Sequence, residues 1–246
     1  MNHLTSVELK SQSRLLALQP SAESIVDDYE RVEVAEHPLF VELAAKPVDL
    51  GAIWLLMANL AAGISRDFVI WLAQTIARVE DRRIASLLAK QLNDELGNGS
   101  FSGIHSGLLD RFVTALERWR PQQAEASVAL EPGRRLARRA SQLFETSKVY
   151  EAVGALMVGE VFAKKMDHCV GDEIRRQSSI GNDDLTWLLL HETLEVDHAD
   201  DSRELAALVP PSDVALAECR RGADAQWLLL WEFLDGVYAL MVRYRS

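Results

Sequence analysis

The residues of this chain whose types and spacing could do chemistry are concentrated between positions 185 and 208. Side chains three and four positions apart share one face of an α-helix. One such stripe begins and ends in leucine and carries two histidines and a glutamate in its middle: Leu188, His191, Glu195, His198, Ser202 and Leu205. Burying a carboxylate that has no partner costs roughly several kcal/mol. A stripe that faces the core therefore needs a partner for these groups, and a metal ion is one.

A solvent-exposed acidic helix that happens to contain two histidines explains the same stretch equally well. Other acidic residues surround the stripe, namely Glu192, Asp197, Asp200 and Asp201. Which explanation holds depends on whether further metal ligands occur elsewhere in the chain.

A second candidate is Glu160, the only charged residue in the apolar run AVGALMVGEVFA at positions 152–163. A lone carboxylate in such a helix favours a buried functional role. An internal arginine or a local water network could satisfy it instead. Gly154 and Gly159 in the same run would let another element approach closely, at a modest cost in helix propensity.

The remaining candidates, Glu95 and His105, flank the glycine-rich segment LGNGSFSGI at positions 96–104. This segment should end one helix after Glu95 and start the next at His105. Each could equally be an ordinary residue at a helix end, and Asp94 competes with Glu95 for the same role.

Together these candidates supply three carboxylates and three imidazoles from four helical segments: Glu95, His105, Glu160, His191, Glu195 and His198. Mixed oxygen and nitrogen ligands suit non-haem iron or manganese, and pairs of such ions occur inside helical bundles. Structural zinc is disfavoured, because neither of the 2 cysteines stands in a metal-binding motif.

The composition describes an ordinary cytoplasmic protein. The 246 residues carry a net charge of −11, which argues against a nucleic-acid partner. The N-terminus lacks a secretion signal, and Glu232 and Asp235 interrupt the most apolar stretch, residues 226–242, so no membrane partner is expected.

Helical patterns cover most of the chain and no sustained period of two occurs, which predicts an all-α fold. We expect a single domain over 1–246, with a peripheral N-terminal arm at 1–35 and a metal-binding helical bundle at 36–246. Ser65 and Asp81 are candidate N-caps. The expected helices are 47–63, 65–79, 81–96, 105–118, 133–170, 185–208 and 214–244.

The order of these motifs resembles the haem-oxygenase-like diiron oxidases, also called iron-containing redox enzymes. The matching features are Glu-Leu-Gly followed by His, a lone Glu in an apolar helix, and His-x3-acid-x2-His. The upstream segment Glu36-His37-Pro38-Leu39-Phe40 is similar to one that starts the first core helix in that superfamily, which includes thiaminase-like and pyrroloquinoline-quinone-synthase-like proteins. The resemblance covers roughly residues 35–240.

The resemblance implies a haem-oxygenase-like bundle of about seven helices that binds two Fe(II) ions without haem, with Mn as the other candidate metal. The six candidate residues would be the ligands, and O2 would be the co-substrate. It further implies oxidation of a small amino-acid-derived or fatty-acid substrate, by N-oxygenation or oxidative C–C cleavage, in natural-product biosynthesis. A homodimer is also expected. Aromatic candidates for the pocket wall are Trp54, Phe101, Phe162, Trp187, Trp227, Trp231 and Tyr238.

Two departures from the family pattern leave other functions open. Glu195 stands where many members have Asp, and the spacing between the first Glu and His varies in the family. A cofactor-free thiaminase-like hydrolase or ligand-binding protein would depend on a cysteine, for which Cys169 is a weak match, or on a buried carboxylate. A ferritin-like protein would repeat Glu-x2-His on two helices, but here only Glu195 and His198 have that spacing.

Overall fold

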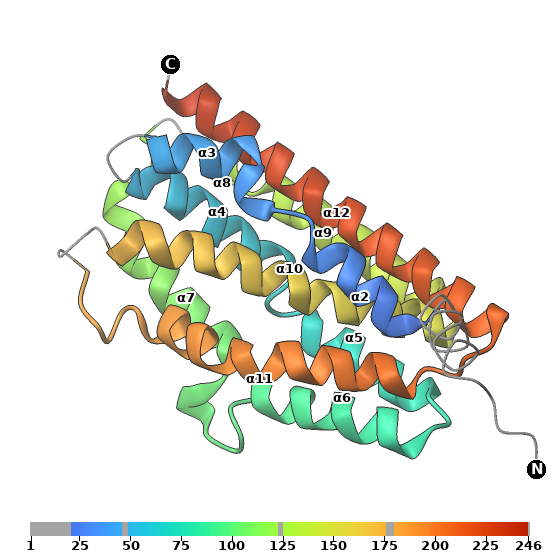
Figure 1. Cartoon of the computed structure of the whole chain (residues 1–246). Coiled ribbons are helices and arrows are strands. Elements are labelled where there is room, and N and C mark those ends of the chain that lie inside the picture. The colour runs from blue at the N-terminus through green and yellow to red at the C-terminus, as the bar shows by residue number, and fades with distance from the viewer. Residues whose placement is uncertain (1–20, 46–48, 123–124, 176–179, 246) are drawn as a thin grey trace, which may run out of the picture.

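The computed structural model describes residues 21–45, 49–122, 125–175 and 180–245, and within these ranges it is helical (Figure 1). The side chains of residues 192–200 lie outside the described part. Ten α-helices of eight or more residues and no strand occur in the described ranges. The prediction of an all-α fold is confirmed.

The helices follow one another with short connections. The bounds of the longer helices are α2 (Ala22–Glu30), α3 (Pro38–Ala45), α4 (Leu50–Gly63), α5 (Phe68–Arg78), α6 (Arg82–Glu95), α7 (His105–Leu116), α9 (Glu131–Thr146), α10 (Val149–Arg175), α11 (Thr186–Leu208) and α12 (Asp213–Arg245). One turn of helix, α8 (Ala126–Ala129), and three 3-10 turns, η1 (Val34–Glu36), η2 (Phe101–Gly103) and η3 (Glu117–Trp119), complete the described elements.

The expected single helix 133–170 is two helices, which is one reason why the bundle has more than about seven. Ser147 is extended, with ψ 157°, and it ends α9. The Glu151 carboxylate accepts a hydrogen bond from the backbone N–H of Lys148 at 2.9 Å and so caps the start of α10. Arg78 holds the break by donating to the Ser147 carbonyl at 2.8 Å.

Two of the helix starts had candidate caps in the sequence, and one of them is confirmed. Asp81 Oδ1 accepts from the backbone N–H of Arg83 at 2.8 Å, which satisfies one donor of the first turn of α6. Ser65 does not cap α5, because a turn intervenes and the helix begins only at Phe68.

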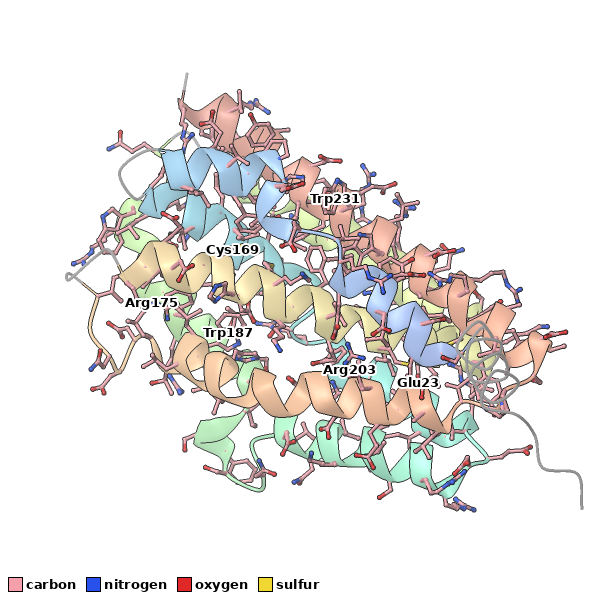
Figure 2. The ribbon with its side chains drawn as sticks, viewed as in Figure 1. Glu23, Cys169, Arg175, Trp187, Arg203 and Trp231 are labelled. Atoms are coloured by element: carbon pink, nitrogen blue, oxygen red, sulfur yellow. The ribbon has the colours of Figure 1, made fainter. Side chains whose placement is uncertain are left out.

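Helix α2 belongs to the bundle, although residues 1–35 were expected to form a peripheral arm. Its Ile25 and Val26 are buried against α10, α11 and α12. Arg203 of α11 lies beside α2 and pairs with Asp27 at 2.8 Å and with Glu30 (Figure 2). The apolar pair at 25–26 explains why this part of the arm packs, and residues 1–20 lie outside the described part.

Helix α10 runs through the middle of the bundle, with α12 along one side and α11 along the other (Figure 1). Glycines allow the backbones of α10 and α12 to touch. A Cβ at Gly154 would lie 2.0 Å from the carbonyl oxygen of Cys219, and one at Gly222 would lie 1.8 Å from that of Glu151. The expected close approach is therefore correct for Gly154 but wrong for Gly159, where a Cβ would meet nothing within 4 Å.

Two helical stretches, Leu50–Arg78 and Asp213–Arg245, are long and apolar enough to span a membrane by length and composition. In both, about half of the most apolar window is buried within the bundle, 50% and 44% respectively. Burial of this kind is typical of core helices in a soluble protein.

His37 connects the start of α3 to the last helix. Its side chain is fully buried, and its Nδ1 accepts a hydrogen bond from the backbone N–H of Leu39 at 3.1 Å. The proton therefore sits on Nε2, which donates to Asp235 Oδ1 at 3.2 Å. Burial lowers the pKa of His37 below its usual value, against the opposing effect of the Asp235 carboxylate.

We predict that Gly154→Ala lowers the free energy of unfolding by at least about 1–3 kcal/mol, because the added methyl group forces α10 away from α12. Gly159→Ala on the same helix is the matched control and should be neutral or stabilising by up to about 1 kcal/mol. Urea unfolding of both variants measures this difference. Equal stabilities would contradict the close contact.

We also predict that His37 contributes to the pH dependence of stability. Since its folded-state pKa is lowered, only the unfolded chain takes up this proton as the pH falls below about 6.5. The stabilisation is complete above that pH and is lost as the pH falls toward the lowered folded-state pKa. As the pH falls, the free energy of unfolding of His37→Asn should decrease less steeply than that of wild type. The two slopes should differ by at most about 1.4 kcal/mol per pH unit.

The matched control for this pH effect is His168→Asn on α10, whose side chain is 71% exposed. It should keep the wild-type slope in urea unfolding series across the same pH range. An unchanged slope in His37→Asn would show that His37 takes up its proton equally in both states.

Candidate metal centre

A tight turn between α6 and α7 sets the geometry of the site. Gly97, Asn98 and Gly99 all have positive φ, at 80°, 53° and 84°. A Cβ at Gly97 would lie only 2.4 Å from the carbonyl oxygen of Ser100, so the turn requires glycine there. The turn reverses the chain and sets the last residue of α6, Glu95, against the first residue of α7, His105.

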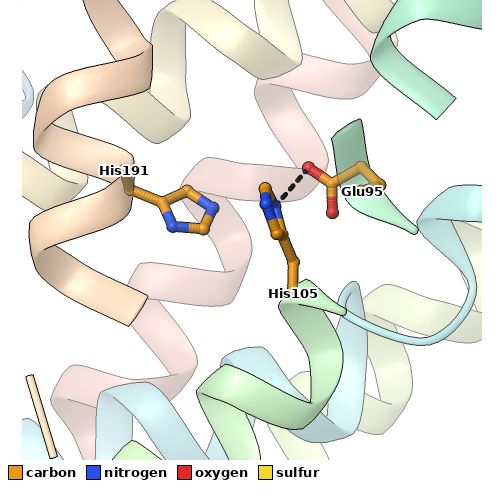
Figure 3. Close-up of side chains that lie close together, drawn as sticks. All are labelled: Glu95, His105 and His191. Atoms are coloured by element: carbon orange, nitrogen blue, oxygen red, sulfur yellow. Dashed lines mark ion pairs between the residues drawn. The ribbon is translucent and has the colours of Figure 1, made fainter. Parts of the chain in front are cut away.

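Glu95 and His105 meet His191 of α11 inside the bundle, and Figure 3 shows the three side chains facing one another. One ligand atom from each lies within 4.8 Å of the other two. Glu95 Oε1 is 3.1 Å from His105 Nδ1, and their side chains are only 13% and 5% exposed. Glu95 is thus not an exposed helix-end residue, and its rival Asp94 does not belong to this group.

The ring of His105 is close to Glu95 without being hydrogen-bonded to it. Within the described residues, Nδ1 of His105 is buried and has no partner in acceptable hydrogen-bond geometry. Two lone pairs that aim at a common point, rather than at each other, would give such a short distance with poor direction. A metal ion at that point would satisfy both atoms, so the pair fits a metal site.

His191 is oriented by its own helix. Its Nδ1 lies 2.8 Å from the carbonyl oxygen of Trp187, and since a carbonyl cannot donate, Nδ1 carries the proton. Nε2 is therefore the ring nitrogen that can bind a metal ion. The Trp187 ring packs on the imidazole at 4.2 Å between centroids, and the centroid of the His105 ring lies 4.9 Å from that of the imidazole. A backbone acceptor behind a histidine is a common arrangement at metal sites.

Glu160 lies outside the group of three but lines the same cavity. Gln91 of α6 donates a hydrogen bond from Nε2 to Glu160 Oε1 at 2.5 Å. The carboxylate is thus held by the neutral amide of Gln91, a partner that the sequence analysis did not name. This bond fixes one oxygen of Glu160 and ties α6 to α10.

Four of the six candidate residues share a mainly apolar cavity of about 110 Å³. One enclosed water needs about 10–15 Å³ on the same measure, so the space can admit a small organic molecule. Glu95, His105, Glu160 and His191 all line this cavity. Among the aromatic candidates, Phe162 and Trp187 line it too, whereas Phe101 is 93% exposed and Trp231 packs on His37.

The other two predicted ligands, Glu195 and His198, lie on α11 one and two turns after His191. Their side chains lie outside the described residues, so their role as ligands stays a prediction. The described members of the same stripe, Leu188, Ser202 and Leu205, are buried.

The donors of this site suit iron better than most metals. They are carboxylate oxygens and imidazole nitrogens, without a thiolate, in a mainly apolar cavity. Such sets favour iron or manganese over structural zinc.

Sequence reasoning missed Gln91 and the supporting role of Trp187. A signal for Gln91 existed, since it stands one turn before Glu95 in the stripe Ile84, Leu88, Gln91, Glu95. A buried polar residue in such a stripe indicates a specific partner. The backbone acceptor at Trp187 gives no signal in the side-chain pattern, because every residue offers a carbonyl.

A family model described as iron-containing redox enzyme matches residues 57–231. Two crystal structures of a CadD-like protein of unknown function from Nostoc punctiforme, at 2.00 Å and 1.35 Å resolution, have a similar fold. The first is 15% identical with a TM-score of 0.64, covering 93% of this chain and 94% of that one. The second is 16% identical with a TM-score of 0.65, covering 97% and 96%. No curated protein matches the sequence.

We predict that anaerobic Fe(II) stabilises the wild-type protein against heat, by about 2.7 kcal/mol at one hundred times the dissociation constant. His105→Ala should lose most of this stabilisation, because it removes a buried nitrogen that has no hydrogen-bond partner among the described residues. His168→Ala, which removes an exposed histidine on α10, is the control and should keep it. Equal stabilisation of the two variants would place the metal elsewhere.

Proposed function

Because the chain belongs to the family of iron-containing redox enzymes, we propose that it is a non-haem diiron oxygenase that uses O2 to oxidise a small substrate. The observation that carries this proposal is the buried group of Glu95, His105 and His191, which converges on one point inside an apolar cavity. Structural ion pairs rarely leave a buried imidazole nitrogen without a hydrogen bond.

The proposed ligands come from four helices: Glu95, His105, Glu160, His191, Glu195 and His198. Two bound Fe(II) ions would supply the electrons that activate O2, and Mn is the other candidate metal. Three of these residues, Glu95, His105 and His191, already lie together in the described structure, and Glu160 lines the same cavity.

The chain's own residues prepare this chemistry in three ways. The Trp187 carbonyl keeps the proton of His191 on Nδ1, so Nε2 carries the lone pair with which the ring would bind a metal ion. Gln91 holds one oxygen of Glu160 and thereby limits how the carboxylate can turn. The walls are mainly apolar, and a substrate that displaces water from them would strengthen electrostatic interactions and protect reactive species from side reactions.

The substrate in this proposal is a small amino-acid-derived or fatty-acid molecule. The reaction would be N-oxygenation or oxidative C–C cleavage in natural-product biosynthesis. These finer statements and the homodimer come from resemblance to the family, whereas the cytoplasmic location comes from the sequence composition. All of them stay predictions.

A cofactor-free thiaminase-like function is the alternative, and its proposed nucleophile is poorly placed for it. Burial, helped by nearby carboxylates, raises the pKa of the Cys169 thiol to about 11. A thiol with that pKa is almost fully protonated at neutral pH and is a weak nucleophile. Cys169 also lies outside the lining of the cavity.

The proposal is tested by loading the protein with Fe(II) under nitrogen, adding O2, and following O2 consumption and visible absorption. We expect rapid O2 uptake and a new absorption band, both lost in His191→Ala and kept in His168→Ala. The iron affinity or the rate of O2 uptake of Gln91→Leu should be about 10–100-fold lower than in wild type, because Glu160 loses its orienting partner. Unchanged O2 uptake in His191→Ala would contradict the proposal.

A further inference from the structure

Gln226, a polar side chain that lines the cavity, has no task in the site described above. Gln226, Leu230 and Phe233 of α12 line the cavity, and their spacing of four and three positions places them on one face of that helix. Gln226 is only 4% exposed. Within the described residues its Oε1 atom is buried and has no hydrogen-bond partner.

A buried amide with a structural role in this protein looks different. Asn59 of α4 donates from Nδ2 to the carbonyls of Leu55 and Ala129 at 2.8 and 2.7 Å. Its Oδ1 accepts from the backbone N–H of Gly133 at 2.9 Å, so the amide joins α4 to α9. An acceptor that is buried without such a bond weakens the fold. Gln226 is therefore better explained by a ligand than by packing.

The charges around the cavity indicate which ligand group would fit. The charged side chains that line it include the carboxylates of Glu95, Glu160 and Asp167, and no Lys or Arg occurs among the described lining residues. Away from the candidate metal ligands, an anionic group would find no counter-charge. An N–H or O–H group can donate to the Gln226 oxygen.

Gln226 and His191 reach the cavity from helices that flank α10 on opposite sides (Figure 1). Apolar residues such as Leu156, Phe162 and Leu230 line much of the remaining wall. A molecule held by Gln226 at a donor group would therefore place an apolar part across the cavity toward the candidate metal ligands.

We propose that Gln226 is a substrate-positioning residue whose Oε1 accepts a hydrogen bond from an amine or hydroxyl group of an otherwise apolar substrate. This inference rests on the proposed function for the identity of the cavity as a substrate site. It selects a donor-bearing substrate over a fatty acid held by its carboxylate at this end of the cavity.

The test measures binding of hexylamine, hexan-1-ol, hexanoate and 1-methoxyhexane to the full-length protein, both metal-free and loaded with Fe(II) under nitrogen. Quenching of tryptophan fluorescence reports binding, since Trp71 and Trp187 line the cavity. The ether lacks a donor and is the reference probe. In wild type, the amine and the alcohol should bind about three- to ten-fold more tightly than the ether.

Gln226→Leu should bind the alcohol and the ether equally, with the ether unchanged. Its melting temperature should stay the same or rise, because an unpaired buried acceptor is removed. Gln142→Leu, which replaces an exposed glutamine on α9, is the matched control and should retain the preference for the alcohol.

Four results would each overturn the inference. Two concern binding to the wild-type protein, namely no binding of any probe and tightest binding of hexanoate in the metal-free state. The other two concern Gln226→Leu, namely a surviving preference for the alcohol and a lower melting temperature. Iron uptake of the same samples separates the two proposals. Normal iron uptake without an alcohol preference contradicts only the role of Gln226. If wild type prefers the alcohol, Gln226→Leu loses that preference, and the protein takes up no iron, only the diiron proposal is contradicted.

Discussion

The contact between Glu95 and His105 is the interaction on which the site depends. It joins the end of one helix to the start of the next, and only a turn with positive φ at Gly97 and Gly99 allows it. Two polar side chains that are nearly excluded from water need a shared partner. The third member, His191, comes from a helix far along the chain, so the site also depends on how α11 is held.

Helix α10 provides the frame for that arrangement. The glycine contacts fix its distance from α12, and Gln91 ties its Glu160 to α6. Lys90 of α6 pairs with Asp201 of α11 at 2.8 Å, which holds the helix of Glu95 beside the helix of His191. Exposed ion pairs of this kind contribute little to stability. Buried packing of α10 against α11 and α12 therefore carries most of the energy.

The sequence predicts the fold better than the details of the site. Period and composition are enough for an all-α bundle, and a cap such as Asp81 is recognisable because its side chain acts on its own helix. The break at Ser147 is not recognisable, since it depends on Arg78 from a distant helix. The packing of α2 likewise depends on partners that local pattern cannot reveal.

For the site, helical spacing correctly grouped His191 with buried neighbours, and the glycine segment correctly indicated a reversal between Glu95 and His105. The sequence could not choose between Glu95 and Asp94, because one position on a helix end turns a side chain by about 100° and only the turn decides which faces inward. Partners such as Gln91 for Glu160, and the unpaired oxygen of Gln226, require the three-dimensional arrangement.

The most direct test of the account is a crystal structure of the protein grown with Fe(II) under nitrogen, with anomalous diffraction measured at the iron absorption edge. The account predicts two iron peaks in the cavity, about 3.5–4 Å apart as in other two-metal sites. One should lie within bonding distance of Glu95 and His105, and His191 and Glu160 should also be ligands. A cavity without iron, or a single peak away from His105, would contradict it.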